Sequence, residues 1–133
     1  KTMSTLSVAT VKSTSSAPPV FQNSSGTEIG QLAKAWVHFK GTGTVSIYDS
    51  FNVSSITDSS QGHYIVNLSV TMANINYAAF ADGRFNTSDG DGAANITLRR
   101  IAQTTTSFGI RCSDASANTH DPTFACGVIF GDS

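Results

Sequence analysis

The residues that could carry chemistry in this chain are mostly acidic, and one short run of them has the composition of a calcium-binding loop. Asp89-Gly90-Asp91-Gly92 places two carboxylates and two glycines within four residues. An EF-hand loop also requires further oxygen ligands in step and a glycine at its sixth position, whereas this segment continues with Ala93 and Ala94. We therefore interpret the run as a surface turn and predict no metal site there.

The three histidines are not spaced as metal ligands either. His38, His63 and His120 lie far apart in the sequence, and no His-x-His pair occurs. A closed zinc site needs four ligands, and the chain offers neither a second cysteine pair nor a histidine pair. We interpret each histidine as a surface or strand residue and predict no cofactor. A metal held on a threefold axis by one histidine per subunit is an alternative that the sequence leaves open.

Hydrolytic chemistry lacks a recognisable pattern. A glycosidase needs two carboxylates about 5–10 Å apart on either side of the sugar bond. Asp49, Asp58, Asp82 and Asp121 are available, but most of them fall at the ends of expected strands, where Asp is a turn residue. Serine is abundant, yet no Gly-x-Ser-x-Gly elbow for a catalytic serine occurs. We predict that the protein is not an enzyme.

The composition excludes further classes of protein. The 133 residues have a net charge of −1 and only 13% charged side chains, without the basic field that nucleic-acid binding requires. No apolar run is long enough to cross a membrane and no signal peptide opens the chain, so we expect Lys1-Thr2-Met3 to lie close to a natural start. Cys112 and Cys126 could bridge two strands, but without a secretion signal the sequence favours two free, buried thiols.

The elements that must position these residues are predicted to be β-strands. Thr, Val, Ile and aromatic residues dominate the extended runs, and no capped helical stretch occurs. Leu32–Phe39 alternates, with Val37 and Phe39 on one face and Trp36 and His38 on the other. Because Trp36 lies in a strand, we expect it to be buried between sheets or subunits. The pattern predicts an all-β fold, an antiparallel β-sandwich of the jelly-roll-like type.

Further segments complete this prediction. After an expected turn at Asp58–Gly62, every second residue from Tyr64 to Val70 is apolar and should face the core. Ser107–Ser113 and Phe124–Phe130 are expected to form a hairpin-like finish. The other expected strands are Thr5–Val11, Val20–Gln22, Val45–Asp49, Phe51–Ile56, Tyr77–Ala81 and Asn95–Gln103, with turns at Asn23–Gly26 and Gly41–Gly43.

The first 30 residues differ from the rest of the chain. The Ser-rich connector Lys12–Pro19 ends in two prolines, which should be extended and cannot donate to a strand ladder. This segment has too little apolar surface to fold alone. We therefore predict an extended N-terminal attachment arm at residues 1–30 and a β-sandwich head domain at residues 31–133. The residues expected to make the attachment are Leu6, Val8, Val11, Pro18, Pro19, Val20 and Phe21.

The most distinctive tract, Trp36–Asp58, contains Trp-Val-His-Phe-Lys-Gly-Thr-Gly-Thr and ends in Asp-Ser-Phe-Asn-Val-Ser-Ser-Ile-Thr-Asp. With three further tracts, it resembles a family of small virion structural proteins from marine tailed phages, including cyanophages, which are often labelled tail-fibre-like. The chain departs from that family at His38, where Asn is usual, and at Tyr48, where Arg is frequent. A ligand shared at those positions is therefore not expected. The further tracts are Ser4–Val8, Val20–Gly30 and Asp121–Asp132.

The resemblance implies a non-enzymatic structural protein on the virion surface, assembled in the host cytoplasm and expected to be a homotrimer. Its implied partners are other copies of itself and a major capsid or tail protein, with no nucleic acid and no membrane. We favour a capsid decoration or head-fibre subunit anchored by the arm. The alternative is a tail-fibre or tail-tip subunit that contacts the host receptor through the loops Asp82–Ala94 and Ser113–Thr123. The expected receptor-facing residues are Asp82, Arg84, Asn86, Asp89, Asp91, Asn118 and His120.

Two rival functions belong to other classes. A lectin-like module would bind a host surface glycan on Trp36, Tyr48 or Tyr77, although the expected burial of Trp36 argues against this. A depolymerising enzyme would turn over host polysaccharide, although no catalytic pattern supports it.

Overall fold

The computed structural model describes residues 4–14, 19–84, 103–114 and 116–132. The chain divides into two units, Lys1–Gln31 and Leu32–Ser133, and each is described by itself. The described residues form nine strands and no helix, and every strand pair is antiparallel. The predicted all-β, antiparallel fold is confirmed.

In the N-terminal unit, strands β1 (Phe21–Gln22) and β2 (Glu28–Gly30) form a short hairpin. The turn between them is closed by the side chain of Asn23, whose Oδ1 accepts the backbone N–H of Ser25 at 3.0 Å and of Thr27 at 2.9 Å. The turn predicted at Asn23–Gly26 is therefore confirmed. The strand predicted at Thr5–Val11 is wrong, because residues 4–14 pair with no other described strand and a lone extended segment has no ladder.

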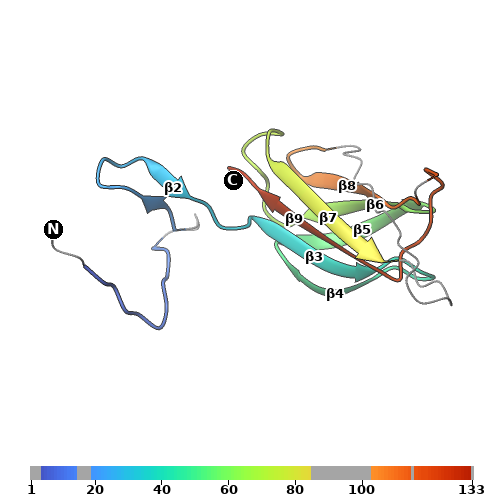
Figure 1. The fold of residues 1–133 in the computed structure, drawn as a ribbon, viewed down its shortest axis with the longest axis horizontal. Coiled ribbons are helices and arrows are strands. Elements are labelled where there is room, and N and C mark those ends of the chain that lie inside the picture. Colours follow the sequence, from blue (N-terminus) through green and yellow to red (C-terminus); the bar gives the residue numbers. More distant parts are fainter. Residues whose placement is uncertain (1–3, 15–18, 85–102, 115, 133) are drawn as a thin grey trace. The chain divides into compact units, whose positions relative to one another are not determined.

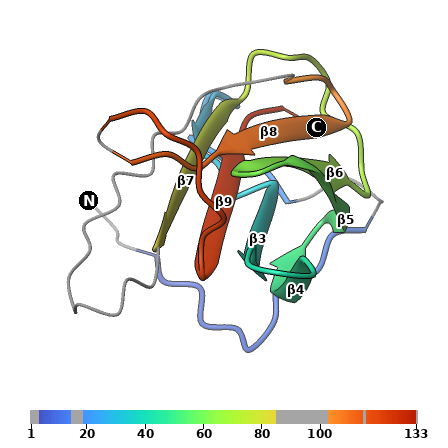
Figure 2. The same ribbon diagram turned by 90° about the vertical axis from the view of Figure 1, so that its right-hand side faces the viewer.

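The second unit, which we call the head, is a sandwich of two sheets (Figure 1). One sheet has the strand order β4-β3-β9-β7 and the other has the order β5-β6-β8, and Figure 2 shows them as facing layers. From β6 to β9, each strand lies in the opposite sheet from the strand before it, which is the alternation typical of a jelly roll. The strands are β3 (Ala35–Lys40), β4 (Ser46–Phe51), β5 (Val53–Ser60), β6 (His63–Leu68), β7 (Ala78–Arg84), β8 (Ser107–Arg111) and β9 (Phe124–Phe130).

The core lies between the two sheets and follows the two-residue period of the strands. On β3, Val37 and Phe39 are buried while Trp36 and His38 face outward, as the alternation predicts. The ring of Phe39 packs against the ring of Tyr64 at 5.1 Å between centroids. The buried apolar residues are Ala35, Val37, Phe39, Tyr64, Val66, Met72, Tyr77, Phe108, Ile110, Cys112, Ala125 and Ile129.

Two sequence predictions about the head are wrong. β8 and β9 do not form a hairpin, because β8 pairs with β6 in one sheet and β9 pairs with β3 and β7 in the other. Val70 is exposed rather than in the core, since β6 ends at Leu68 and the alternation ends with it. The strand predicted at Asn95–Gln103 falls almost entirely outside the described residues.

The segment predicted as a turn, Asp58–Gly62, does connect β5 to β6. β5 continues to Ser60, so Gln61 and Gly62 alone form the turn. Gly62 has a φ of 68°, in the left-handed region that favours glycine. The loop before β9 closes over this turn: Oδ1 of Asp121 accepts the N–H of Gly62 at 2.8 Å and lies 2.8 Å from the Tyr64 hydroxyl. The turn is therefore held by a chain segment some sixty residues away in the sequence.

Candidate functional site

The predicted attachment residues of the arm lie uncovered within their own unit. Leu6 is 81% exposed and Val11 is 64% exposed, and Val8, Val20 and Phe21 are exposed as well. Pro19 is half-buried, and Pro18 lies outside the described residues. Exposed apolar side chains gathered on one extended segment are typical of a segment that binds another surface.

The outer face of the four-stranded sheet carries a row of apolar side chains across all four strands. Trp36 on β3 stands opposite Phe51 on β4 and opposite Val128 on β9, and Val128 stands opposite Phe80 on β7. Three of these side chains, Trp36, Phe51 and Phe80, are large and exposed, with Phe80 58% exposed. We call these four residues the apolar row. The expectation that Trp36 lies between the sheets is wrong, because its position on β3 is in step with the outward residues.

The neighbouring outward-facing residues of the same four strands, two positions away along each strand, form a second row with an aspartate at each end. His38 stands opposite Asp49 on β4 and opposite Cys126 on β9, and Cys126 stands opposite Asp82 on β7. The ring of His38 also contacts the ring of Tyr48 at 5.0 Å between centroids. We call Asp49, His38, Cys126 and Asp82 the acidic row. The two rows place carboxylates directly beside the exposed aromatic side chains.

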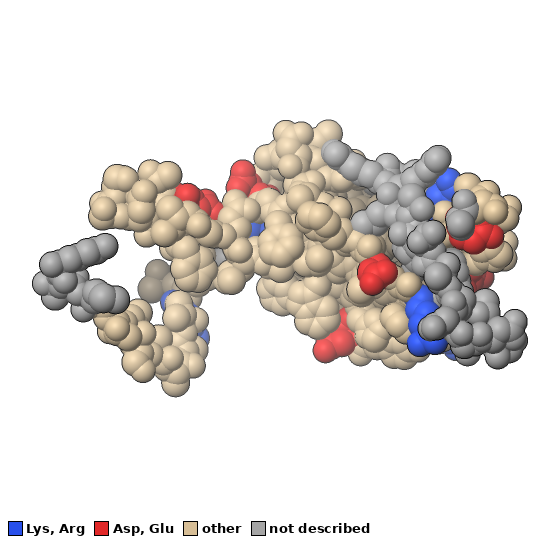
Figure 3. Space-filling view, in the orientation of Figure 1, with Lys and Arg blue, Asp and Glu red and all other residues tan. Residues whose placement is uncertain are grey.

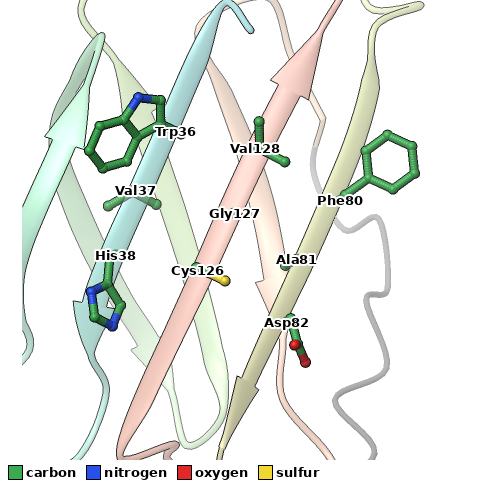
Figure 4. Close-up of a pocket in the computed structure, with 9 residues that line it drawn as sticks. All are labelled: Trp36, Val37, His38, Phe80, Ala81, Asp82, Cys126, Gly127 and Val128. Atoms are coloured by element: carbon green, nitrogen blue, oxygen red, sulfur yellow. The ribbon is translucent and has the colours of Figure 1, made fainter.

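These two rows border a groove that runs along β9 (Figure 4). Trp36 and Phe80 rise on either side of it, while the smaller side chains of Val128 and Cys126 form its floor. The groove has a volume of about 310 Å³, at the lower end of the range of about 300–1,000 Å³ that binding pockets occupy. Among the described residues, its lining contains no lysine or arginine, and few of their charged side chains are visible on the face of the head that Figure 3 shows.

The predicted receptor-facing residues fall in different places. Asp82 and Arg84 are exposed on β7, at the border of the groove and just beyond it. Asn118 and His120 lie together in the loop before β9, where both contact Asp114. Asn86, Asp89 and Asp91 lie outside the described residues. The structure therefore brings Asn118 and His120 together and leaves Asp82 and Arg84 on the sheet.

The carboxylate of Asp114 organises that loop. It accepts the N–H groups of Ser116 and Asn118 at 2.9 Å each, the side-chain amide of Asn118 at 3.1 Å, and lies 3.0 Å from Nε2 of His120. The hydrogen bonds from the Asn118 side chain, then from His120, lower the pKa of Asp114 to about 2. Sequence reasoning missed Asp114, although an Asp with Ser two residues later and Asn four residues later is typical of an Asx-type turn.

We expect this loop to loosen only in strong acid. Because the folded pKa of Asp114 lies below the ordinary value of 3.8, its hydrogen bonds stabilise the loop fully above about pH 3.8 and are lost as the pH falls through about 2. An NMR titration of the Asp114 carboxyl carbon should therefore have its midpoint near pH 2. In Asn118→Ala the midpoint should move up towards 3.8, and a midpoint already at 3.8 in the unchanged protein would contradict the assignment.

The remaining carboxylates considered for hydrolysis do not face one another. Asp49 and Asp82 lie on the two outermost strands of one sheet, Asp58 lies on β5 of the other, and Asp121 is engaged by Gly62 and Tyr64. Burial, and then the hydrogen bond to Asp121, raises the pKa of the Tyr64 hydroxyl. In the part of the chain that the structure describes, no group of three His, Cys, Asp or Glu residues could hold a metal ion.

The two cysteines are free and lie in different environments. Cys112 is buried in the core, where burial, and then the charge of Asp121, raises its pKa to about 12. Cys126 is exposed on the floor of the groove, so the prediction of two buried thiols is wrong for this one. The alternation of β9 explains the difference, because Ala125, Gly127 and Ile129 face the core.

Of the three aromatic residues that the lectin hypothesis assigns to sugar binding, one is buried. Tyr77 is buried, and its hydroxyl donates to backbone carbonyl oxygens at Thr104 and Ser107, 2.9 and 2.8 Å away. Trp36 and Tyr48 are exposed on the outer face.

Comparisons of the chain with protein-family models, curated proteins and solved structures found no match. Among the described residues, the structure has no helix long and apolar enough to span a membrane.

Proposed function

We propose that this protein is a non-enzymatic structural subunit on the exterior of a tailed-phage virion. Its head, residues 31–133, forms the exposed body, and its arm, residues 1–30, anchors it to a neighbouring subunit or virion protein. The observation that carries the proposal is the exposure of the apolar side chains of the arm, Leu6 and Val11 above all.

The head and the arm differ in how many apolar contacts each makes within its own unit. All described core residues of the head lie between Ala35 and Ile129, so these residues make their apolar contacts within their own unit. The arm has one hairpin of two short strands, and a two-stranded hairpin is marginally stable by itself in water. An apolar segment of this kind gains order by binding a partner, and this supports an attachment role.

The resemblance in Trp36–Asp58 to virion structural proteins of marine tailed phages supports the same function. It also supports the trimeric state that we propose. Between the two placements, we favour a capsid decoration or head fibre anchored by the arm, and a tail-fibre subunit is the alternative.

The mass of the protein in solution tests this function. We expect the full chain to form an oligomer, with a trimer having three times the 13.9 kDa mass of the chain, and residues 31–133 to be monomeric. Light scattering coupled to size-exclusion chromatography measures both masses. Because the truncated chain retains every core residue that the structure describes, its circular dichroism should show a folded β protein. Monomers of both chains would contradict the self-association that we propose.

Imaging of phage particles with a label on this protein tests the placement. Label over the whole shell would support capsid decoration, and label confined to the tail would support the tail-fibre alternative. Particles without any label would contradict the virion location.

A further inference from the structure

Two exposed apolar surfaces of this chain carry opposite charges, one on the head and one on the arm. This inference rests on the proposed attachment role of the arm and names what the arm binds.

On the head, the groove along β9 is open and mostly apolar, with one acidic side chain, Asp82, in its described lining. Trp36 and Phe80 form its walls, and Val128 and Cys126, two residues apart on one strand, form its floor. Of the residues that the structure describes, Asp82 lines the groove and no lysine or arginine does. The basic side chain of Arg84 lies further along β7, beyond the acidic row. The groove therefore suits an extended apolar segment that carries positive charge.

On the arm, residues 4–14 have these properties. Leu6, Val8 and Val11 are exposed, and Lys12 is the only charged side chain in this stretch. In an extended chain, Leu6 and Val8 project to the same side with the spacing that separates Val128 from Cys126, because side chains two apart on a strand share a face. The ammonium group of Lys12 complements the carboxylates of the acidic row.

We propose that the groove along β9 receives residues 4–14 from the arm of a second copy of this chain. Leu6 and Val8 lie between Trp36 and Phe80, and Lys12 lies towards Asp82. Because the arm of one copy meets the head of the next, the contact is heterologous, and such contacts close into rings when the rotation between copies allows it. A ring of three copies is the trimer proposed above.

The composition of the groove favours this occupant over a sugar. A glycan needs several hydrogen-bonding partners beside its stacking platform, whereas the groove walls and most of the floor are hydrocarbon. The arm supplies apolar side chains to cover them.

The two cysteines provide a direct test, because Cys126 is exposed in the groove and Cys112 is buried with a raised pKa. Leu6→Cys and Val8→Cys, made in separate chains, place a second accessible thiol on the arm. Under mild oxidation we expect at least one of these variants to form disulfide-linked dimers and trimers on non-reducing gels, since a bridge requires Cα atoms within about 7 Å. The same variant with Cys126→Ser should form none.

A matched control moves the accessible thiol to the other sheet. Ser59→Cys, combined with Cys126→Ser and the arm cysteine, presents an exposed thiol on β5. We expect no linked species from this chain. Linking at Ser59→Cys as readily as at Cys126 would overturn the proposal, because it would indicate random collision.

The reactivity of Cys126 gives a second measurement on the protein with no added cysteine. If the arm covers the groove in about nine copies of ten, a thiol reagent should modify Cys126 about tenfold more slowly in the full chain than in residues 31–133. Equal rates would overturn the proposal.

The outcomes separate this inference from the proposed function. If truncation abolishes the oligomer but neither arm cysteine links to Cys126, the attachment role of the arm is retained. The groove is then overturned as the site where the arm binds. A disulfide formed within one chain also overturns docking in a second copy. Monomers of both the full and the truncated chain overturn the self-association itself and this inference with it.

Discussion

Gly62→Ala should destabilise the head by about 2–5 kcal/mol, because two penalties act at this position. The φ of 68° is strained for any residue with a Cβ, which costs about 1–2 kcal/mol. The added Cβ would also lie 2.6 Å from the carbonyl oxygen of Cys112 and 2.9 Å from the backbone nitrogen of His120. These are backbone atoms, so the loop over the turn must move and would weaken the hydrogen bond from Gly62 to Asp121.

Gly43→Ala is the matched control for that prediction. Gly43 has nearly the same φ, 67°, but an added Cβ would meet nothing within 4 Å. It should therefore show the conformational cost alone, about 1–2 kcal/mol. Urea unfolding of residues 31–133, followed by the fluorescence of Trp36, measures both variants without a contribution from association. Equal destabilisation of the two variants would show that the loop does not pack on Gly62 as described.

Phe108→Ala should cost about 3–5 kcal/mol, the range for removing a large buried aromatic side chain. Phe108 is the second residue of β8, is 1% exposed and belongs to the core between the sheets. Its ring lies over Gly127, where an added Cβ would be only 3.1 Å from Cε2, so the residue beneath the ring has no side chain to fill the cavity. Since small domains are stable by about 5–15 kcal/mol, this loss removes a large part of the total.

Phe80→Ala makes the same chemical change on the outer face. Phe80 is 58% exposed, so in residues 31–133 its removal should change the free energy of unfolding by no more than about 0.5 kcal/mol. Urea unfolding again measures both. A loss at Phe80 comparable to the loss at Phe108 would contradict the assignment of inner and outer faces to the four-stranded sheet.

Local patterns predicted the parts of this fold that depend on neighbours in the chain. The alternation of β3 assigned Val37 and Phe39 to the core, since successive side chains on a strand face opposite ways. The turns at Asn23–Gly26 and Asp58–Gly62 were predicted because Asn and Gly satisfy backbone conformations that few other residues tolerate. The alternation of side chains also accounts for the exposure of Cys126, because Cys126 alternates with the buried residues of β9.

Other features depend on which strands meet, and no local pattern contains that information. β8 and β9 follow one another as a hairpin would, but each pairs with strands of a different sheet. The apolar row joins Trp36, Phe80 and Val128 from three distant segments, so its existence depends on strand order and register. The arm segment 4–14 shows the converse, because its apolar alternation finds no partner strand among the described residues.

Residue type and two-residue spacing were thus sufficient for the fold class, the inward face of β3 and the tight turns, because each is a matter of backbone sterics and local side-chain direction. The order of strands in the sheets, the groove along β9 and the closure of Asp121 over Gly62 required the folded chain. They arise from contacts between segments far apart in sequence, whose pairing is chosen by the burial of the whole core.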